Sequence, residues 1–408
     1  MKFPRELPIP EDVLDIARAL DRAGHEVWCV GGAIRDALIG AEAGGPPLRP
    51  ADIDFTTSAL PEQVQTLFGR KRTVDVGLKH GTVGVLDRAR VLHEVTTFRR
   101  DVATDGRHAD VVHEGVTLEQ DLARRDFTIN AIAYHPFKHE WRDPFDGATD
   151  LDRRIIRAVG DPAARFREDY LRILRALRFA ARFEFTIDPA TWQAAKAAAP
   201  GLAQLSAERV RDEWFKGLRT AQSVPQLVQL WRDVGAARIW IPELEHAPVP
   251  GDGYSADEVN REPRDPVLLV ALLCANPAAV LERLRGSNAE ISRAQAISRA
   301  PGEPAGESPA AVRRWLATSG SAADDLLQLW RLRRGTDAPW SGVAAEIRRR
   351  GDPLTRGDLA IDGNDLIALG VARGPRLGEV LDRLLDRVLD DPSLNSREQL
   401  SALARELA

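Results

Sequence analysis

The hydrophobic pattern divides the chain into a mixed N-terminal part and a long helical part. Residues 11–23 carry apolar side chains at helical spacing, whereas residues 25–30, HEVWCV, are typical of a buried strand. LPEQVQTLF predicts a short helix, and β-branched alternation predicts strands in TVGVL and RVLHEVTTF. Strand signals fade after Leu151, so we predict a mixed α/β unit over residues 1–150 and a largely helical remainder. Residues 286–310 are small, polar and rich in proline and glycine, which predicts a linker or a mobile helix boundary.

Composition places the chain among ordinary globular proteins. Its 408 residues are enough for two to four domains, and its two cysteines, Cys29 and Cys274, exclude a disulfide framework and a zinc site. The sequence has neither a run of about 18 apolar residues nor a signal-like start, so we expect a cytoplasmic protein. The net charge of −5 argues against a protein that coats nucleic acid with its whole surface, but it allows a local basic track.

Carboxylates on two predicted strands form the first candidate site. In PADIDFTTS, Asp52 and Asp54 are one residue apart, and strand alternation places both side chains on one face. Two like charges so close repel each other unless a cation or a basic group neutralises them, and oxygen ligands suit Mg²⁺. Glu94, within HEVTTF, is a candidate for a third carboxylate. Solvent-facing acids are the alternative interpretation for all three residues.

A glycine pair in VGGAIRD predicts a turn from a strand into a helix. Gly31 and Gly32 allow backbone N–H groups to approach an anion, and the helix N-terminus adds its dipole. Arg35, in the first helical turn, can reach a phosphate. The alternative is a plain tight turn.

The segment RRDFTINAIAY predicts the start of an apolar helix, capped by Asp126 or Thr128. Arg124 and Arg125 come directly before it. The alternative is an ordinary helix start with two surface arginines.

One predicted helix, within REDYLRILRALRFAARF, carries an arginine face. Helical spacing places Asp169 at its border and puts four arginines opposite the apolar residues: Arg172, Arg175, Arg178 and Arg182. The wider window from residue 152 to residue 182 holds nine arginines and only four acids. A solvated face usually alternates in sign, so arginines without interleaved acids indicate a polyanion such as a triphosphate.

Taken in order, VGGAIRD, ADIDF, HGT, RRDFTINA and EDYLRILRALRF resemble the class II tRNA nucleotidyltransferases, the CCA-adding enzymes of the DNA polymerase β superfamily. Bacterial poly(A) polymerases share most of these motifs. The resemblance is dense over residues 27–183 and weaker at SAERVRDEW and at GDPLTRGDLAIDGNDLIALG. It implies an α+β fold in which a nucleotidyltransferase head with a small mixed β-sheet precedes all-helical parts. The expected domains are the head (1–150), the neck for base recognition (151–220), the body (221–310) and the tRNA-binding tail (311–408).

The resemblance also implies roles for individual residues. Asp52 and Asp54 are expected to hold two Mg²⁺ ions, with Glu94 as a third catalytic carboxylate. The residues expected to bind the nucleotide are Gly32, Arg35, Arg125, Asp169, Arg172, Arg175 and Arg178.

Hydrogen-bond polarity explains how two of these residues can select the base. Cytosine and adenine both present an exocyclic amine beside a ring-nitrogen acceptor, which suit Asp169 and Arg172 respectively. Uracil and guanine instead present a carbonyl acceptor beside an N–H donor, so each would leave a buried charge of this pair without a partner.

The predicted function is template-independent addition of C, C and A to the 3′ end of tRNA, with CTP and ATP as substrates. Residues 98–115 resemble the full-length flexible loop of CCA-adding enzymes, which is shortened in CC-adding enzymes. An A-adding enzyme or a poly(A) polymerase is the main alternative. A catalytically silent RNA-binding homologue is disfavoured by the intact DxD and EDxxR, and a small-molecule nucleotidyltransferase by the long helical part. The sequence leaves open the oligomeric state and which body and tail residues contact tRNA.

Overall fold

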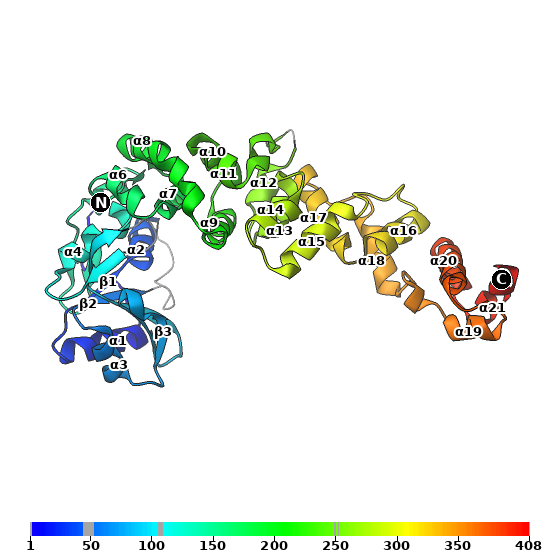
Figure 1. The fold of residues 1–408 in the computed structure, drawn as a ribbon, viewed down its shortest axis with the longest axis horizontal. Helices are drawn as coiled ribbons and strands as arrows, with labels where there is room; N and C mark the ends of the chain where they lie inside the picture. Colours follow the sequence, from blue (N-terminus) through cyan, green and yellow to red (C-terminus); the bar gives the residue numbers. More distant parts are fainter. Residues whose placement is uncertain (1, 44–52, 105–108, 249, 252, 408) are drawn as a thin grey trace. The chain divides into compact units, whose positions relative to one another are not determined.

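The computed structural model of the chain contains two compact units, residues 1–240 and 241–408 (Figure 1). Within them, the residues that the structure describes are 2–43, 53–104, 109–248, 250–251 and 253–407. The division after Trp240 falls inside the segment predicted as the body, and the predicted domain boundaries stay predictions.

A seven-stranded mixed sheet organises the first unit, with the strand order β3-β4-β5-β2-β1-β8-β9. Strands β2 and β5 are parallel, and the other neighbours in this sheet are antiparallel. The strands are β1 (Val27–Val30), β2 (Asp54–Thr57), β3 (Thr73–Gly77), β4 (Thr82–Leu86), β5 (Leu92–Thr97), β8 (Ala133–His135) and β9 (Glu140–Arg142). Two smaller sheets pair β6 (Arg100–Thr104) with β7 (Ala109–Val112) and β10 (Ile155–Ile156) with β11 (Thr186–Ile187).

Helices of the first unit lie before, between and after these strands (Figure 1). Those within the sheet-forming part are α1 (Glu11–Arg22), α2 (Gly32–Ala43), α3 (Pro61–Phe68), α4 (Leu118–Ala123) and α5 (Gly147–Asp152). The later ones are α6 (Pro162–Glu168), α7 (Leu171–Phe183), α8 (Pro189–Ala198), α9 (Ala207–Thr220), α10 (Val224–Val234) and α11 (Ala236–Trp240). This mixed sheet followed by helices confirms the predicted α+β fold.

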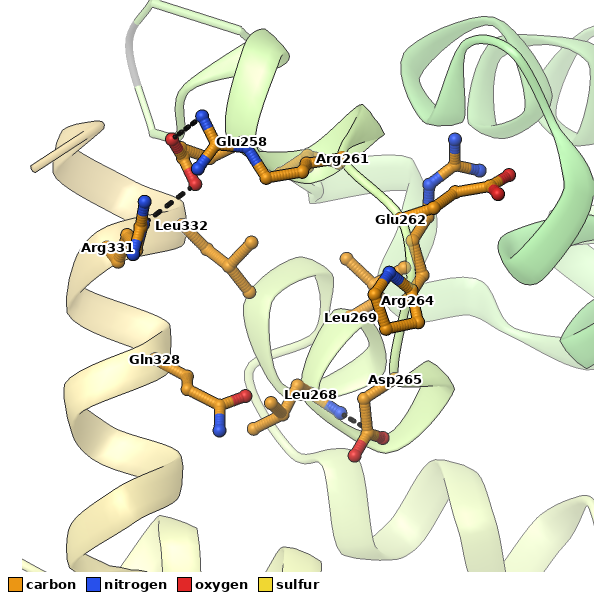
Figure 2. Close-up of a pocket in the computed structure, with 12 residues that line it drawn as sticks. Glu258, Arg261, Glu262, Arg264, Asp265, Leu268, Leu269, Gln328, Arg331 and Leu332 are labelled. Carbon is orange, nitrogen blue, oxygen red and sulfur yellow. Dashed lines mark hydrogen bonds and ion pairs between the residues drawn. The ribbon is translucent and has the colours of Figure 1, made fainter.

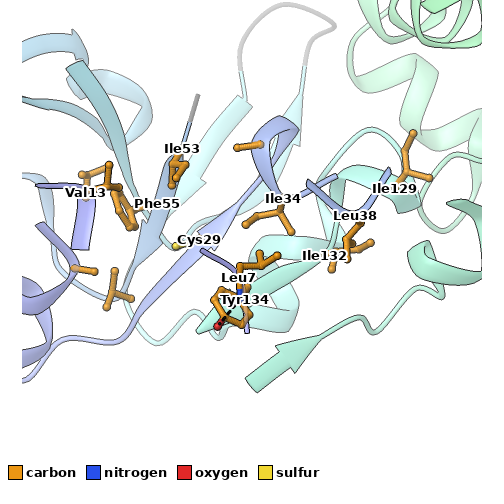
Figure 3. Close-up of a cluster of buried hydrophobic side chains, with 14 of the residues drawn as sticks. Leu7, Val13, Cys29, Ile34, Leu38, Ile53, Phe55, Ile129, Ile132 and Tyr134 are labelled. Atoms are coloured by element: carbon orange, nitrogen blue, oxygen red, sulfur yellow. Dashed lines mark hydrogen bonds between the residues drawn. The ribbon is translucent and has the colours of Figure 1, made fainter. Parts of the chain in front are cut away.

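The core of the first unit determines the orientation of β2. Ile53 and Phe55 are each 1% exposed and lie in the cluster of apolar side chains shown in Figure 3. Because side chains alternate along a strand, Asp54 between them faces away from this cluster. The apolar neighbours of Asp54 therefore set the direction of its carboxylate.

The second unit is helical throughout the described residues. Its helices are α12 (Ala256–Asn260), α13 (Pro266–Leu273), α14 (Pro277–Arg283), α15 (Asn288–Arg299), α16 (Pro309–Ser319), α17 (Ala323–Arg334), α18 (Ser341–Arg350), α19 (Gly363–Ala368), α20 (Pro375–Asp390) and α21 (Arg397–Leu407). A separate apolar cluster joins the last three of these helices. Among the described residues, no helix combines the length and the apolar character needed to cross a membrane.

Two local predictions differ from the structure. Residues 286–310, predicted as a linker or a helix boundary, are not a linker throughout, because they contain helix α15 and end where α16 begins. Helix α15 starts with a capping box in which Ser287 and Glu290 each accept the other's backbone N–H. The predicted apolar helix after Arg125 is instead a short 3₁₀ turn (Thr128–Asn130) followed by strand β8. β8 is buried along its whole length, and a fully buried strand has the same continuous apolar sequence as a buried helix.

Candidate active site

Two carboxylates meet on neighbouring strands of the large sheet. Asp54 begins β2, and the parallel pairing of Phe55 with Val95 places Asp54 beside Glu94 on β5. Burial, and after it the charge of Glu94, raise the pKa of Asp54 to about 6. The structure thus brings together two of the three predicted carboxylates, whereas Asp52 lies outside the described residues. Within the described residues alone, no group of three or more potential metal ligands is found.

The space that a Cβ atom of residue 31 would fill, called here the hollow beside Gly31, borders both Asp54 and Arg125. Gly31 has a φ of +83°, which favours glycine, and a Cβ atom there would lie 3.7 Å from Oδ2 of Asp54 and 3.8 Å from Nη1 of Arg125. Gly32 is the first residue of α2, so the N-terminus of this helix borders the same turn. A carboxylate, a guanidinium group and a helix N-terminus therefore surround one small space.

Asp121 holds Arg125 in place, although the sequence analysis did not single it out. Its carboxylate is fully buried and pairs with Arg124 at 2.7 Å and with Arg125 at 3.4 Å. It also accepts hydrogen bonds from the hydroxyl of Thr56 and the backbone N–H of Arg99. Burial raises the pKa of Asp121, but the two arginines outweigh it and the net shift is downward. The spacing of three and four residues in DLARR was the available sequence signal.

Arg35 is buried between α2 and α7, so the expectation of an accessible phosphate ligand does not fit its position. Its side chain is 3% exposed and donates to Asp36 at 2.8 Å and to Oδ1 of Asn130 at 2.5 Å. The guanidinium group also lies 4.8 Å from the ring centres of both Phe179 and Phe183. In this structure, Arg35 packs α2 against α7.

The arginine face of α7 has acidic partners, so the premise that this face lacks acids is wrong, whereas triphosphate binding by it stays a prediction. Other segments of the first unit supply the carboxylates, which the spacing within one helix cannot show. The ion pairs are Arg172 with Glu168 (2.6 Å), Arg175 with Asp126 (2.7 Å) and Glu213 (3.7 Å), Arg178 with Glu213 (2.7 Å), and Arg182 with Asp36 (2.8 Å). Arg178 is only 7% exposed.

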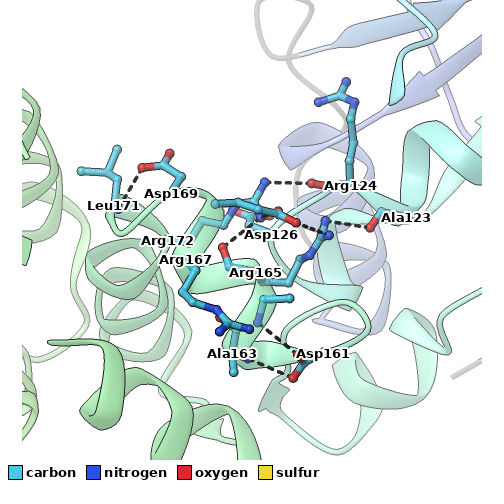
Figure 4. A network of polar contacts seen from close by, with 12 residues as sticks. Ala123, Arg124, Asp126, Asp161, Ala163, Arg165, Arg167, Asp169, Leu171 and Arg172 are labelled. Carbon is cyan, nitrogen blue, oxygen red and sulfur yellow. Dashed lines mark hydrogen bonds and ion pairs between the residues drawn. The ribbon is translucent and has the colours of Figure 1, made fainter. Parts of the chain in front are cut away.

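The predicted base-selecting pair lies where α6 meets α7 (Figure 4). The backbone N–H of Arg172 donates to the carbonyl of Asp169 at 3.1 Å, but their side chains form no ion pair with each other. The Asp169 carboxylate instead accepts the backbone N–H of Leu171 and pairs with Arg209 at 2.7 Å. Arg172 is held by Glu168, which also pairs with Arg165.

Arg172 keeps part of its hydrogen-bonding capacity. Both Nη1 hydrogens donate, one to Glu168 and one to the carbonyl of Arg165, and Nη2 donates once to the carbonyl of Arg124. The Nε–H and one Nη2–H of Arg172 donate to none of the residues that the structure describes. The guanidinium group is therefore fixed in orientation while two donors remain for a further partner.

Comparison with known proteins identifies the relatives of this chain. Residues 27–157 match the family described as "Poly A polymerase head domain", and residues 184–247 match "Probable RNA and SrmB- binding site of polymerase A". The CCA-adding enzyme of Geobacillus stearothermophilus is 35% identical over 414 residues, which cover 97% of this chain and 96% of that protein. The chain belongs to the CCA-adding enzyme family. The CCA-adding enzyme of Leuconostoc mesenteroides subsp. mesenteroides is 33% identical over 98% of this chain and 97% of its own length.

Solved structures of CCA-adding enzymes share the fold. The Bacillus stearothermophilus enzyme in complex with CTP has a TM-score of 0.79 and 32% identity, covering 97% of this chain and 96% of that chain. The Thermotoga maritima enzyme complexed with tRNA_CCA has a TM-score of 0.65 and 20% identity, covering 98% and 97%. These comparisons confirm the resemblance that the sequence motifs indicated.

Asp126 provides a prediction for the stability of this family member. Its carboxylate accepts from Arg175 at 2.7 Å, from Asn130 at 2.9 Å and from the backbone N–H of Phe127. Burial opposes ionisation, but Arg175 and Asn130 outweigh it and lower the pKa of Asp126 to about 2. Because the folded-state pKa lies below the unfolded value, this group stabilises the fold above about pH 4 and loses that effect as the pH falls toward 2.

We therefore expect Asp126→Asn to lower the free energy of unfolding by about 2 kcal/mol at pH 7, and the loss to shrink below about pH 4. Urea unfolding of both proteins between pH 7 and pH 3 measures the difference. Asp12→Asn, at an exposed position of α1, is the control. If the free energy of unfolding of Asp126→Asn stayed below that of the wild type by the same amount from pH 7 to pH 3, an electrostatic cause would be contradicted.

A cavity of about 280 Å³ in the second unit contains none of the predicted site residues. It lies between α17 and the segment from α12 to α13, and an ion pair between Arg331 and Glu258 (3.0 Å) closes one side of it (Figure 2). A second hollow of about 470 Å³, in the first unit, is lined by residues that include Arg167 and Tyr170, which lie on either side of Glu168 and Asp169 in the sequence. Neither hollow includes the carboxylates.

Proposed function

We propose that this chain adds C, C and A in turn to the 3′ end of tRNA, from CTP and ATP, with release of pyrophosphate. The observation that carries the proposal is the 35% identity to a CCA-adding enzyme over 97% of this chain and 96% of that protein. The match covers the helical parts as well as the catalytic head. The solved relative with 32% identity is a complex with CTP, which supports CTP as one substrate.

The carboxylates fit a divalent cation, for which we propose Mg²⁺. Asp54 and Glu94 supply oxygen donors, and their mutual repulsion is part of what raises the pKa of Asp54 to about 6. The hollow beside Gly31 leaves room next to Asp54. Asp52, Asp54 and Glu94 are therefore the residues that would hold the ions. When bound, these ions would activate the RNA 3′-hydroxyl and neutralise charge on the triphosphate and the departing pyrophosphate.

The chain's own cationic and N–H groups would position the triphosphate. Arg125 faces the hollow and is oriented by Asp121, so its fork of donors is held ready for phosphate oxygens. The N-terminus of α2 at Gly32 adds backbone N–H groups and a favourable dipole. Arg175 and Arg178 lie farther along α7 and would reach a nucleotide only by sharing or releasing Glu213 and Asp126.

Base selection would use the fixed Arg172 and the carboxylate of Asp169. The remaining Nε–H and Nη2–H of Arg172 suit the ring-nitrogen acceptor of cytosine or adenine, and Asp169 suits their exocyclic amine. In this structure the Asp169 carboxylate is paired with Arg209, whose side chain is 40% exposed. Reading a base therefore requires Asp169 to exchange Arg209 for the base amine or to bind both.

Three RNA substrates test the proposed function. The protein is incubated with a tRNA lacking CCA, a tRNA ending in CC, and an unstructured RNA, each with CTP, ATP or both, and the products are sized. We expect full CCA on the first tRNA and a single A on the second. Addition of A alone to tRNA would indicate an A-adding enzyme, long tracts of A on the unstructured RNA a poly(A) polymerase, and no addition a silent homologue.

The hairpin β6–β7 provides a prediction for the switch from C to A. Arg100 pairs with Val112 across the hairpin, so residues 101–111 can be replaced by two glycines without separating the strand ends. The loop tip, residues 105–108, lies outside the described residues. Since this segment resembles the loop that CC-adding enzymes have shortened, we expect the variant to stop at CC on tRNA lacking CCA. Normal C addition by the same variant is the internal control, and a full CCA product would show that the loop is dispensable.

A further inference from the structure

A buried histidine contacts the backbone directly before β2, the strand that begins with Asp54. His93 lies on β5, directly before Glu94, and its side chain points to the opposite face of the sheet, where it is 1% exposed. Its Nδ1 lies 2.9 Å from the backbone carbonyl oxygen of Ile53. The carbonyl oxygen can only accept, so Nδ1 carries the proton in this contact.

Asp87 holds the other side of the ring. Its Oδ2 lies 3.3 Å from Nε2 of His93, and its Oδ1 accepts the backbone N–H of Val91 at 2.8 Å. Asp87 is 3% exposed and stands at the turn between β4 and β5, where its backbone also bonds to Val91. The turn between β4 and β5 therefore holds the Asp87 carboxylate in place, and this carboxylate restrains the orientation of the His93 imidazole.

The Ile53 carbonyl belongs to the peptide unit that joins Ile53 to Asp54. Backbone pairing between β2 and β5 begins one residue later, at Phe55 and Val95, so His93 reaches the strand just before the pairing starts. Rotation of this peptide unit would change φ of Asp54 and turn its carboxylate away from Glu94. The hydrogen bond from His93 to this carbonyl therefore restrains the backbone of Asp54, whose carboxylate the proposed chemistry uses.

We propose that His93, held by Asp87, is a positioning residue that orients the Asp54 carboxylate through the Ile53 carbonyl. The inference rests on the proposed nucleotidyl transfer at Asp54, Glu94 and Asp52. His93 touches neither substrate nor metal in this role. It restrains the backbone of β2 from the buried face of the sheet, while the chemistry takes place on the other face.

Three variants separate positioning from filling of the core. His93→Leu keeps the bulk but removes the donor, whereas His93→Asn returns an N–H donor near the Nδ1 position and leaves the Asp87 contact unmade. His135→Leu is the matched control, because His135 is 3% exposed, accepts two backbone hydrogen bonds through Nδ1 and packs against Trp28. Measurements are kcat and KM for CTP on tRNA lacking CCA, and melting temperature.

We expect His93→Leu to lower kcat by about ten- to a hundredfold with KM for CTP unchanged, since a misdirected catalytic group costs rate rather than substrate affinity. His93→Asn should recover most of kcat although it melts as low as His93→Leu. His135→Leu should melt lower with wild-type kcat. The inference is overturned if His93→Leu retains wild-type kcat, or if His93→Asn turns over no faster than His93→Leu.

A second readout separates this inference from the proposed function. Binding of Mn²⁺ to the nucleotide-free protein, followed by electron paramagnetic resonance, is compared in the wild type, His93→Leu and His93→Asn. If the wild type adds no nucleotide, the proposed function has failed, and Mn²⁺ affinity decides the positioning role. Weaker Mn²⁺ binding in His93→Leu, restored in His93→Asn, supports it, and equal binding by all three proteins rejects it.

Discussion

Replacing Asp54 with alanine is expected to lower kcat for C and A addition by at least about 10³-fold while tRNA still binds. Asp54 is the described carboxylate nearest the hollow beside Gly31, and its neighbour Glu94 is exposed. Loss of its carboxylate removes an oxygen ligand for the cation and leaves the charge of the triphosphate less well neutralised. tRNA binding should persist because the change is confined to one side chain of the head.

Steady-state kinetics and a gel-shift assay measure the two expectations for Asp54→Ala. Asp54→Asn, which keeps the shape but not the charge, should be nearly as inactive. Glu140→Ala removes a carboxylate from β9, an edge strand of the same sheet, and should turn over like the wild type. Near-normal turnover by Asp54→Ala with Mg²⁺ present would remove Asp54 from the catalytic site.

Strand alternation allowed the central part of this site to be predicted. Ile53 and Phe55 are apolar and buried, so the strand and the face occupied by Asp54 followed from their spacing. Glu94 was predicted in the same way from its own strand. The pairing of the two strands was not predictable from either segment, because register is set by contacts between residues about 40 positions apart.

The partners of the arginines could not be predicted from one helix. Arg175 and Arg178 share Glu213 on α9, and Arg175 also pairs with Asp126, 49 residues earlier in the chain. Periodicity describes one helix face and contains no information about what packs on it. The same limit explains Arg35, which the sequence placed correctly in the first turn of α2 but which the packing of α7 buries.

The segment after Arg125 shows a different limit. Its apolar residues suit a helix and a buried strand equally well, and pairing with β1 decided between them: Cys29 lies opposite Tyr134 and Val30 opposite Ala133. Asp126, predicted as a helix cap, instead accepts the Asn130 side chain and Arg175. The helix-cap interpretation of Asp126 was wrong, because its charged partner comes from α7, which the local sequence could not reveal.

The proposed base-selecting pair, Asp169 and Arg172, gives the second large expected effect. Asp169→Ala should reduce the discrimination against UTP and GTP from about 10³-fold toward about tenfold, while C and A incorporation also slows. The physical reason is that the carboxylate repels the carbonyl that uracil or guanine presents in place of the exocyclic amine. Arg172→Ala should slow both correct bases, because their ring nitrogen then lacks a donor.

The contacts of Asp169 provide controls for a purely structural role. Asp169 accepts the backbone N–H of Leu171 and pairs with Arg209, so its loss also removes a cap and an ion pair. Arg209→Ala removes the same ion pair but keeps the carboxylate, and Asp169→Asn keeps an oxygen for Leu171 without the charge. Competition among the four nucleotides, together with melting temperatures, separates these effects. If Asp169→Ala melts like Arg209→Ala and still prefers C and A as the wild type does, the carboxylate is structural and the base is read by other groups.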